Sequence, residues 1–114
     1  MDTKSRGRQC EDLAARWYAD NGYTVVLRNY RSPAGEIDII CSRNGLVVFS
    51  EVKSIPACWD SPDMGMKIPP SKVMKMKKTA SHYLARNCGT VYDSIRFDAV
   101  FVTGNSVRCI EGAF

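Results

Sequence analysis

The sequence predicts an α/β protein in which helices flank a β-sheet, with elements in the order αβββαββ. Two stretches, residues 8–21 and 70–87, carry apolar side chains at the spacing of one helical face. The other apolar stretches are rich in β-branched residues and are separated by short turns that contain Gly or Asn, which is typical of strands. With 114 residues, of which 45% are hydrophobic, the chain is predicted to form one domain over residues 1–114.

The first helix is predicted over residues 8–21, and Asn21-Gly22 is a typical helix end. Its apolar face consists of Cys10, Leu13, Ala14, Trp17 and Tyr18. A strand over residues 23–30 follows, and a turn at residues 32–35 leads from it into the next strand.

Residues 35–53 are predicted to form a β-hairpin. Two apolar, β-branched strands enclose the polar turn of residues 42–45, which contains the Asn-Gly pair favoured in tight hairpins. Side chains two apart on a strand point to the same face, so Glu51 and Lys53 project together, and the hairpin can bring Asp38 beside them. The sequence therefore predicts that two carboxylates and a lysine meet at one point of the sheet.

The second half of the chain is predicted to contain one helix and two strands. The helix covers residues 70–87, and its apolar face consists of Val73, Met76, Ala80, Tyr83 and Leu84. Strands over residues 95–103 and 107–110 follow, joined by a turn at Gly104-Asn105.

Residues 54–69, between the hairpin and this helix, are predicted to form an irregular loop because they contain three prolines. Two interpretations are open, a substrate-guiding flap beside the site or a mobile insertion. Trp59 in this loop could stack on an unpaired base, although a lone tryptophan more commonly anchors a loop.

The grouping of Asp38, Glu51 and Lys53 is suited to magnesium-dependent hydrolysis of a phosphodiester. Mg²⁺ prefers oxygen ligands and usually keeps several waters, so two carboxylates and a substrate phosphate are enough to hold it. Lys53 would orient the attacking water or neutralise charge in the transition state. A Glu-x-Lys pair at a strand end is more often a surface ion pair. Asp38, however, interrupts a run of isoleucines, where a charge needs a partner or a metal.

A series of residues along nearly the whole chain matches a known pattern: Gly7, Glu11, Ala14, Gly22-Tyr23, Arg28-Asn29, Gly35-Glu36-Ile37-Asp38, Phe49, Glu51-Val52-Lys53, Lys72, Ala80, Tyr83-Leu84, Arg96-Phe97-Asp98 and Ala113-Phe114. In these residues the chain resembles the small YraN-like uncharacterised protein family of the restriction-endonuclease-like superfamily. The resemblance implies a single endonuclease-like domain with a mixed β-sheet flanked by helices. It also implies that the superfamily's nuclease motif falls on Asp38, Glu51 and Lys53, and that Glu11 is a helix acid that joins the metal site.

A basic segment between residues 64 and 92 is a candidate phosphate-binding surface. It contains no Asp or Glu, although the net charge of the whole chain is only +4. The residues predicted to bind nucleic acid are Lys72, Lys75, Lys77 and Lys78. Lysines on the outer face of a helix are equally typical of a solvated surface. Lys72 is the stronger candidate because it matches the family position before the second helix.

The sequence also predicts a soluble, cytoplasmic protein without membrane association. It shows no basic and apolar leader, no long apolar span and no lipidation motif. The cysteines contain no Cys-x-x-Cys pair, so we expect reduced thiols rather than disulfides or a zinc site. They are Cys10, Cys41, Cys58, Cys88 and Cys109.

We expect a nuclease that uses Mg²⁺, with Mn²⁺ able to substitute, and hydrolyses DNA phosphodiester bonds, including those of branched or damaged DNA. One alternative is a non-catalytic nucleic-acid-binding accessory protein of DNA processing. Another is a protein-interaction module whose acidic cluster is structural. The enzyme requires Asp38, Glu51 and a divalent ion together, the accessory protein requires the lysines but not the acids, and the interaction module requires neither.

Overall fold

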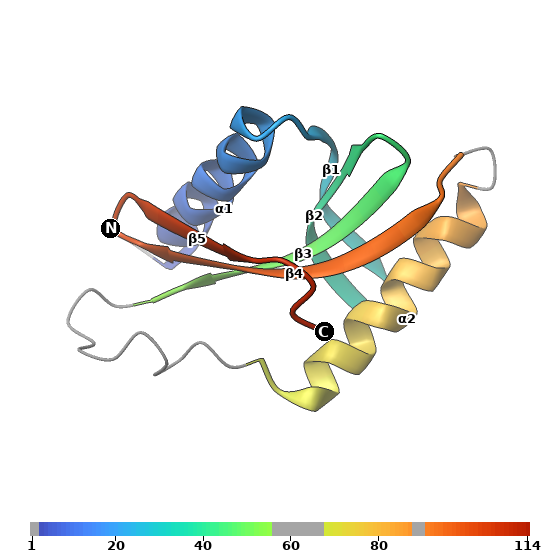
Figure 1. Ribbon diagram of the computed structural model, residues 1–114. Coiled ribbons are helices and arrows are strands. Elements are labelled where there is room, and N and C mark those ends of the chain that lie inside the picture. The colour runs from blue at the N-terminus through green and yellow to red at the C-terminus, as the bar shows by residue number, and fades with distance from the viewer. Residues whose placement is uncertain (1–2, 56–67, 88–90) are drawn as a thin grey trace.

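Two helices and five strands make up the described part of the computed structural model, which covers residues 3–55, 68–87 and 91–114. They follow in the order αβββαββ, as predicted, and the helices lie on opposite faces of the sheet (Figure 1). The elements are α1 (Thr3–Asp20), β1 (Thr24–Ser32), β2 (Gly35–Arg43), β3 (Leu46–Ser54), α2 (Pro70–Arg86), β4 (Ser94–Thr103) and β5 (Ser106–Ile110).

The start of α1 differs most from the predicted bounds. The helix begins at Thr3 and not at residue 8. Its first turns carry polar side chains, so they have no apolar face that hydrophobic spacing could reveal. The predicted end is confirmed: Gly22 follows the helix with φ of +88°, a left-handed conformation that glycine adopts without steric penalty.

The sheet is mixed and has the strand order β1-β2-β3-β4-β5. Neighbouring strands are antiparallel except β3 and β4, which are parallel. Parallel strands need a long crossover connection, and α2 lies in that crossover. The predicted fold class, a restriction-endonuclease-like mixed sheet flanked by helices, is therefore confirmed.

The turn between β2 and β3 sets the register of the central hairpin. Asn44 and Gly45 have φ of 48° and 83°, and two central residues with positive φ are typical of the type I′ turns that suit twisted hairpins. The turn pairs Arg43 with Leu46. The predicted Asn-Gly hairpin is thus confirmed, and its register determines which residues of β2 and β3 meet further along.

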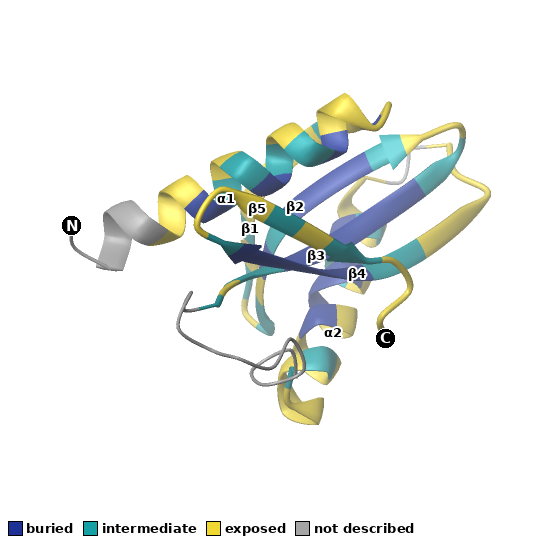
Figure 2. Cartoon of the chain, turned by 60° about the vertical axis from the view of Figure 1, so that its left-hand side comes forward, coloured by how far each residue is buried: buried dark blue, intermediate teal, exposed yellow. Residues whose placement is uncertain are grey.

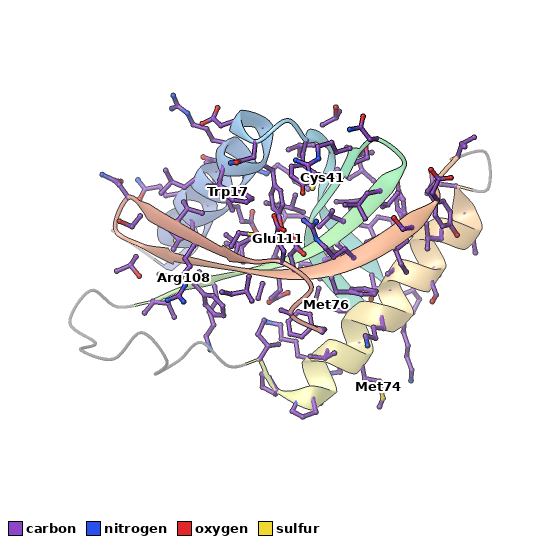
Figure 3. All side chains as sticks on the ribbon, viewed as in Figure 1. Trp17, Cys41, Met74, Met76, Arg108 and Glu111 are labelled. Atoms are coloured by element: carbon purple, nitrogen blue, oxygen red, sulfur yellow. The ribbon has the colours of Figure 1, made fainter. Side chains whose placement is uncertain are left out.

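Each face of the sheet carries its own apolar core. Cys10, Ala14 and Tyr18 of α1 pack on one face, and Ala80 and Tyr83 of α2 pack on the other. Figure 2 shows the buried stripe on each helix turned toward the buried strands. In Figure 3, Met76 of α2 points to the sheet and Met74 points away from it. Within the described residues neither helix combines the length and the apolarity that a membrane span requires.

Three of the five cysteines lie in the described part of the chain. Cys10, Cys41 and Cys109 are free, and all three contribute to the core beneath α1. Burial is the main reason that the thiol pKa of Cys41 and of Cys109 rises to about 12. The expectation of reduced thiols stays a prediction, with which the three free, core-lining cysteines agree.

Several predictions fall outside the described residues. These are the bulk of the 54–69 loop, with Trp59 and Cys58, and also Cys88. They stay predictions. At the edge of the loop, Ser54 belongs to β3, because its pairing with Val102 continues the parallel register.

A buried polar cluster joins α1 to β4. The Asp98 carboxylate has no exposed surface. It accepts hydrogen bonds from the Tyr18 hydroxyl at 2.8 Å and from Arg96 Nε and Nη2 at 2.8 and 2.9 Å. The Gly112 amide donates to it at 3.0 Å. Buried charge is tolerated only when it is paired and hydrogen-bonded in this way.

We expect Tyr18→Phe to lower the free energy of unfolding by about 1–3 kcal/mol, because it removes a donor from a fully buried carboxylate. Urea denaturation followed by circular dichroism measures the change. Tyr92→Phe removes a hydroxyl from an exposed tyrosine and is expected to stay within about 0.5 kcal/mol of the wild type. Equal losses in the two variants would contradict the structural role of the cluster.

Candidate active site

Asp38 lies on β2 where its pairing with β3 ends. The paired register stops at Ile39↔Ser50, and continuing it by one residue puts Asp38 opposite Glu51. At this point the Val52 amide of β3 donates a hydrogen bond to Asp38 Oδ2 at 2.7 Å. The carboxylate therefore takes the place of a backbone acceptor and is held against β3, as the hairpin prediction required.

The backbone is distorted around Asp38. Ile37 packs in the core beneath α2, whereas Ile39 packs in the core beneath α1. Residues two apart on a regular strand would share a face. On β1, Asn29 lies between the residues that pair with Ile37 and Ile39, and its φ is 56°, which is uncommon for a residue other than glycine. The distortion explains how an aspartate is accommodated between two fully buried isoleucines.

Glu51 lies on the face of β3 that is covered by α2. Val47 and Phe49, at the preceding alternate positions, are in the core on that face. Only 7% of the Glu51 side chain is exposed, and its Oε1 forms an ion pair with Lys72 Nζ from the first turn of α2. An apolar stripe therefore leads to the charged end of β3, and the cover of α2 buries the carboxylate.

Lys53 shares this face of β3 with Glu51. The parallel register of β3 and β4 is unbroken from Leu46 to Ser54, so alternation puts residues two apart on the same side. The intervening Val52 packs against the opposite core. The structure thus brings together the three predicted catalytic residues of the hairpin, Asp38, Glu51 and Lys53.

The electrostatics of the site are dominated by carboxylates. The pKa of Asp38 rises to about 7, first because the group is buried and then because of the charges of Glu51, Glu11 and Glu36. The hydrogen bond from the Val52 amide acts in the opposite direction. A cation between Asp38 and Glu51 would relieve this repulsion.

Lys72 responds to the same carboxylates. Burial opposes the charge on its ammonium group, but the hydrogen bond with Glu51 and the charges of Glu51, Asp38 and Glu36 outweigh that effect, and the pKa of Lys72 rises. The ammonium is therefore held firmly in its charged form at the acid pair.

Glu11, the predicted helix acid, is directed to β1. Its Oε2 accepts a hydrogen bond from Asn29 Nδ2 at 3.1 Å and lies 3.7 Å from Arg28 Nη2. The charge of Glu11 still contributes to the raised pKa of Asp38. Its role as a metal ligand stays a prediction, because these β1 contacts engage its carboxylate.

A polar cavity of about 550 Å³ lies between α1 and β1 beside Glu11. Its lining includes Arg8, Arg28, Arg31 and Glu36. The sequence motifs predicted no catalytic or binding role for Arg28, Arg31 or Glu36. The matching pairs Arg28-Asn29 and Gly35-Glu36 were the signal that could have pointed to this part of the site.

The donor set at the acid pair fits a hard divalent cation. Within the described residues, no group of three or more His, Cys, Asp or Glu side chains is arranged to hold a metal ion. Asp38 and Glu51 nevertheless offer two adjacent, largely buried carboxylates, and Mg²⁺ is commonly held by one or two carboxylates plus water and substrate phosphate. The residues present therefore fit Mg²⁺ as a two-carboxylate site.

The lysines of α2 fall into two groups. Lys72 and Lys75 are near the acidic end of the sheet, since Lys72 contacts Glu51 and Lys75 packs over Gly35 at the start of β2. Lys77 and Lys78 line a groove of about 540 Å³ on the outer side of α2, together with Val73 and the exposed Met74. Lys75, Lys77 and Lys78 are all exposed. The predicted basic surface thus follows α2 away from the acid pair.

The chain is similar to a family of bacterial proteins. Residues 10–102 match the model of the uncharacterised protein family UPF0102. A UPF0102 protein of Desulfosudis oleivorans is 41% identical over 95% of this chain and 88% of its own length. A UPF0102 protein of a Sulfurihydrogenibium species is 37% identical over 100% of this chain and 97% of its own length. A UPF0102 protein of Treponema pallidum is 35% identical over 86% and 77%.

The raised pKa of Asp38 generates a pH prediction. An unfolded aspartate ionises near pH 4, whereas the folded carboxyl keeps its proton to about pH 7. The folded state therefore binds more protons between these values, and wild-type stability falls as the pH rises through this range. We therefore expect the free energy of unfolding of Asp38→Asn, relative to that of the wild type, to increase by about 1–3 kcal/mol from pH 5 to pH 8.

Urea denaturation at both pH values, without divalent ions, measures this gain. Asp20→Asn is the matched control, because the Asp20 side chain is 72% exposed and its exchange should leave the pH profile unchanged. Parallel profiles for the wild type and Asp38→Asn would show that Asp38 is not protonated in the folded protein at pH 5.

Proposed function

The chain belongs to the uncharacterised protein family UPF0102, and we propose that it is a metal-dependent nuclease that hydrolyses DNA phosphodiester bonds. This membership confirms the resemblance to an uncharacterised protein family that the residue pattern indicated. The names of its relatives state no activity, so the proposal rests on the site. The observation that carries it is the pair of largely buried carboxylates, Asp38 and Glu51, beside Lys53.

The proposed reaction is hydrolysis. The oxygen of a water attacks phosphorus, the bond between phosphorus and one ester oxygen breaks, and a proton of the water ends on that leaving oxygen. Bound Mg²⁺ would supply polarisation of the phosphoryl oxygen and a water of lowered pKa. Asp38 and Glu51 would hold this ion through their carboxylate oxygens, and Mn²⁺ could substitute for it.

The function of Asp38 requires the ionised carboxylate. The Val52 amide fixes Oδ2 and favours the charged form, while burial and Glu51 favour the protonated form. A carboxyl with a pKa of about 7 gains charge readily when a cation arrives, because opposite charge lowers the pKa of an acid. The site is therefore suited to bind a divalent ion near neutral pH.

Lys53 provides positive charge next to the acid pair. Its ammonium would donate to the attacking water or to phosphoryl oxygens as negative charge grows in the transition state. This role does not require Lys53 to ligate the metal. Loss of the lysine should therefore lower the rate without removing the ion.

The basic surface of α2 supports nucleic acid as the substrate class. Lys75, Lys77 and Lys78 are exposed on the helix that packs above the acid pair. Such lysines would neutralise phosphates on either side of the scissile bond. If they bind DNA and no cleavage occurs, the accessory-protein alternative takes the place of the nuclease.

Cleavage of linear, flapped and four-way DNA with Mg²⁺ or Mn²⁺ tests the proposal. We expect cleavage of at least one substrate by the wild type. In Lys53→Ala the rate should fall about 10²- to 10³-fold, the typical effect of one well-placed donor. Asp38→Ala should stop cleavage by loss of the metal, and Asp20→Asn should cleave at the wild-type rate.

Two results would overturn parts of this proposal. A wild-type protein that binds DNA and cuts none of the substrates with either ion is a binding protein and not a nuclease. If Lys53→Ala cuts as fast as the wild type, Lys53 has no catalytic role. Circular dichroism spectra of all variants establish that they are folded.

The salt dependence of DNA binding tests the α2 surface separately. The slope of log K against log salt is about −0.9 for each phosphate neutralised on duplex DNA. We therefore expect the double variant Lys75→Ala, Lys78→Ala to have a slope smaller in magnitude by up to about 1.8, which is twice 0.9. Arg16→Ala, which removes an exposed arginine from α1, is the control. An unchanged slope in the double variant would assign its lysines to solvation.

A further inference from the structure

The ion pair between Lys72 and Glu51 joins a solvent-exposed lysine to a buried carboxylate. The Lys72 side chain is 54% exposed, and that of Glu51 is 7% exposed. The pair also joins two elements, the first turn of α2 and the end of β3. Among the described residues, no other lysine of α2 forms an ion pair. The lysine can therefore leave its partner for water, whereas the carboxylate cannot.

The acid pair needs a compensating positive charge in the metal-free protein as well as in the metal-bound protein. Glu51 is close enough for its charge to disfavour the charge of Asp38, and burial weakens the help from water. In the metal-free protein Lys72 supplies that charge. A divalent ion between the two carboxylates would supply more charge, and it would bind the same Glu51 carboxylate that Lys72 now contacts through Oε1.

We propose that Lys72 is the counter-ion of the acid pair in the metal-free protein, and that a divalent ion displaces it from Glu51 and frees its ammonium for a phosphate of the substrate. Two cations at one carboxylate repel each other, so the ion and Lys72 compete for Glu51. This inference rests on the proposed function, because it takes the acid pair to be the metal site.

The position of Lys72 suits a phosphate contact after the exchange. The first turn of α2 carries no acidic residue, and the positive end of the helix dipole there favours an anion. Lys75 lies one turn further along the same helix and is exposed. A displaced Lys72 would therefore remain within a positive region beside the metal, where the scissile phosphate has to bind.

The exchange makes metal binding and DNA binding cooperative. The metal frees a cation for the phosphate, and a phosphate that holds Lys72 clears Glu51 for the metal. Thermodynamic linkage requires the two effects to be equal in size. The structure thus assigns to Lys72 a positioning role that Lys75, Lys77 and Lys78 do not share, because Lys72 is the lysine that contacts Glu51.

Metal affinity in the absence of DNA tests the competition directly. Titration of Mn²⁺ by calorimetry or paramagnetic relaxation compares the wild type with Lys72→Met, which keeps the apolar stem and removes the charge. Lys75→Met is the matched control, since it removes the same charge from an exposed neighbour. We expect Kd for Mn²⁺ to fall about tenfold in Lys72→Met and much less in Lys75→Met.

A second variant, Lys72→Gln, tests the same competition if Lys72→Met does not fold. In Lys72→Gln a neutral amide can still donate a hydrogen bond to Glu51, so the carboxylate keeps a partner. It should also bind Mn²⁺ more tightly than Lys75→Met does. Thermal melts give an independent readout, because tighter binding means a larger rise in Tm on adding Mn²⁺.

Cooperativity is measured on a variant that should cut DNA about 10²- to 10³-fold more slowly than the wild type. In a Lys53→Ala background, Mn²⁺ should tighten the binding of duplex DNA several-fold, and adding Lys72→Met should reduce that gain to the part that the metal's own phosphate contact supplies. Adding Lys75→Met should lower DNA affinity with and without metal by similar factors, so the gain persists.

The outcomes separate this inference from the proposed function. Equal Mn²⁺ affinity in Lys72→Met and Lys75→Met, with binding lost in Asp38→Asn, would overturn the counter-ion role and leave the metal site intact. Mn²⁺ binding that is absent in the wild type, or unchanged in Asp38→Asn with Glu51→Gln, would overturn both the metal site and the inference.

Discussion

Two carboxylates held side by side with little access to water are the constraint that the rest of this molecule must satisfy. The Glu51 side chain is 7% exposed, and Asp38 keeps its proton to about pH 7 because burial and Glu51 oppose its charge. Groups in such positions need partners. Asp38 obtains the Val52 amide, and Glu51 obtains the ammonium of Lys72. The sheet and α2 therefore each supply a partner that stabilises one of the two buried carboxylates.

The same sheet contains a third buried carboxylate, Asp98, and the contrast is informative. Asp98 accepts two hydrogen bonds from Arg96 and others from Tyr18 and the Gly112 amide. This set neutralises it permanently and ties α1 to β4. Asp38 has no ion pair within the described part of the chain and lies near other acids. Asp98 is therefore fixed in a stabilising network, whereas Asp38 is the carboxylate that we propose for an exchangeable cation.

The local features of the molecule could be predicted from residues close together in the sequence. Helical spacing identified both helices, and the Asn44-Gly45 turn identified the central hairpin. Because a two-residue turn sets the register of its strands, the same few residues determine that Asp38 meets Glu51. The acid pair was predictable for this reason. The polar first turns of α1 were not, since they carry no apolar pattern.

Contacts between elements that are distant in the sequence were decided only by the tertiary structure. The parallel pairing of β3 with β4 depends on where the crossover through α2 packs, and that packing also brings Lys72 to Glu51. The direction of Glu11 toward Arg28 and Asn29 depends on how α1 lies across β1. The sequence by itself determined the composition of the site and the register of its hairpin. The partner of each charge was decided by helix packing, because ion pairs between elements leave no periodic pattern in the chain.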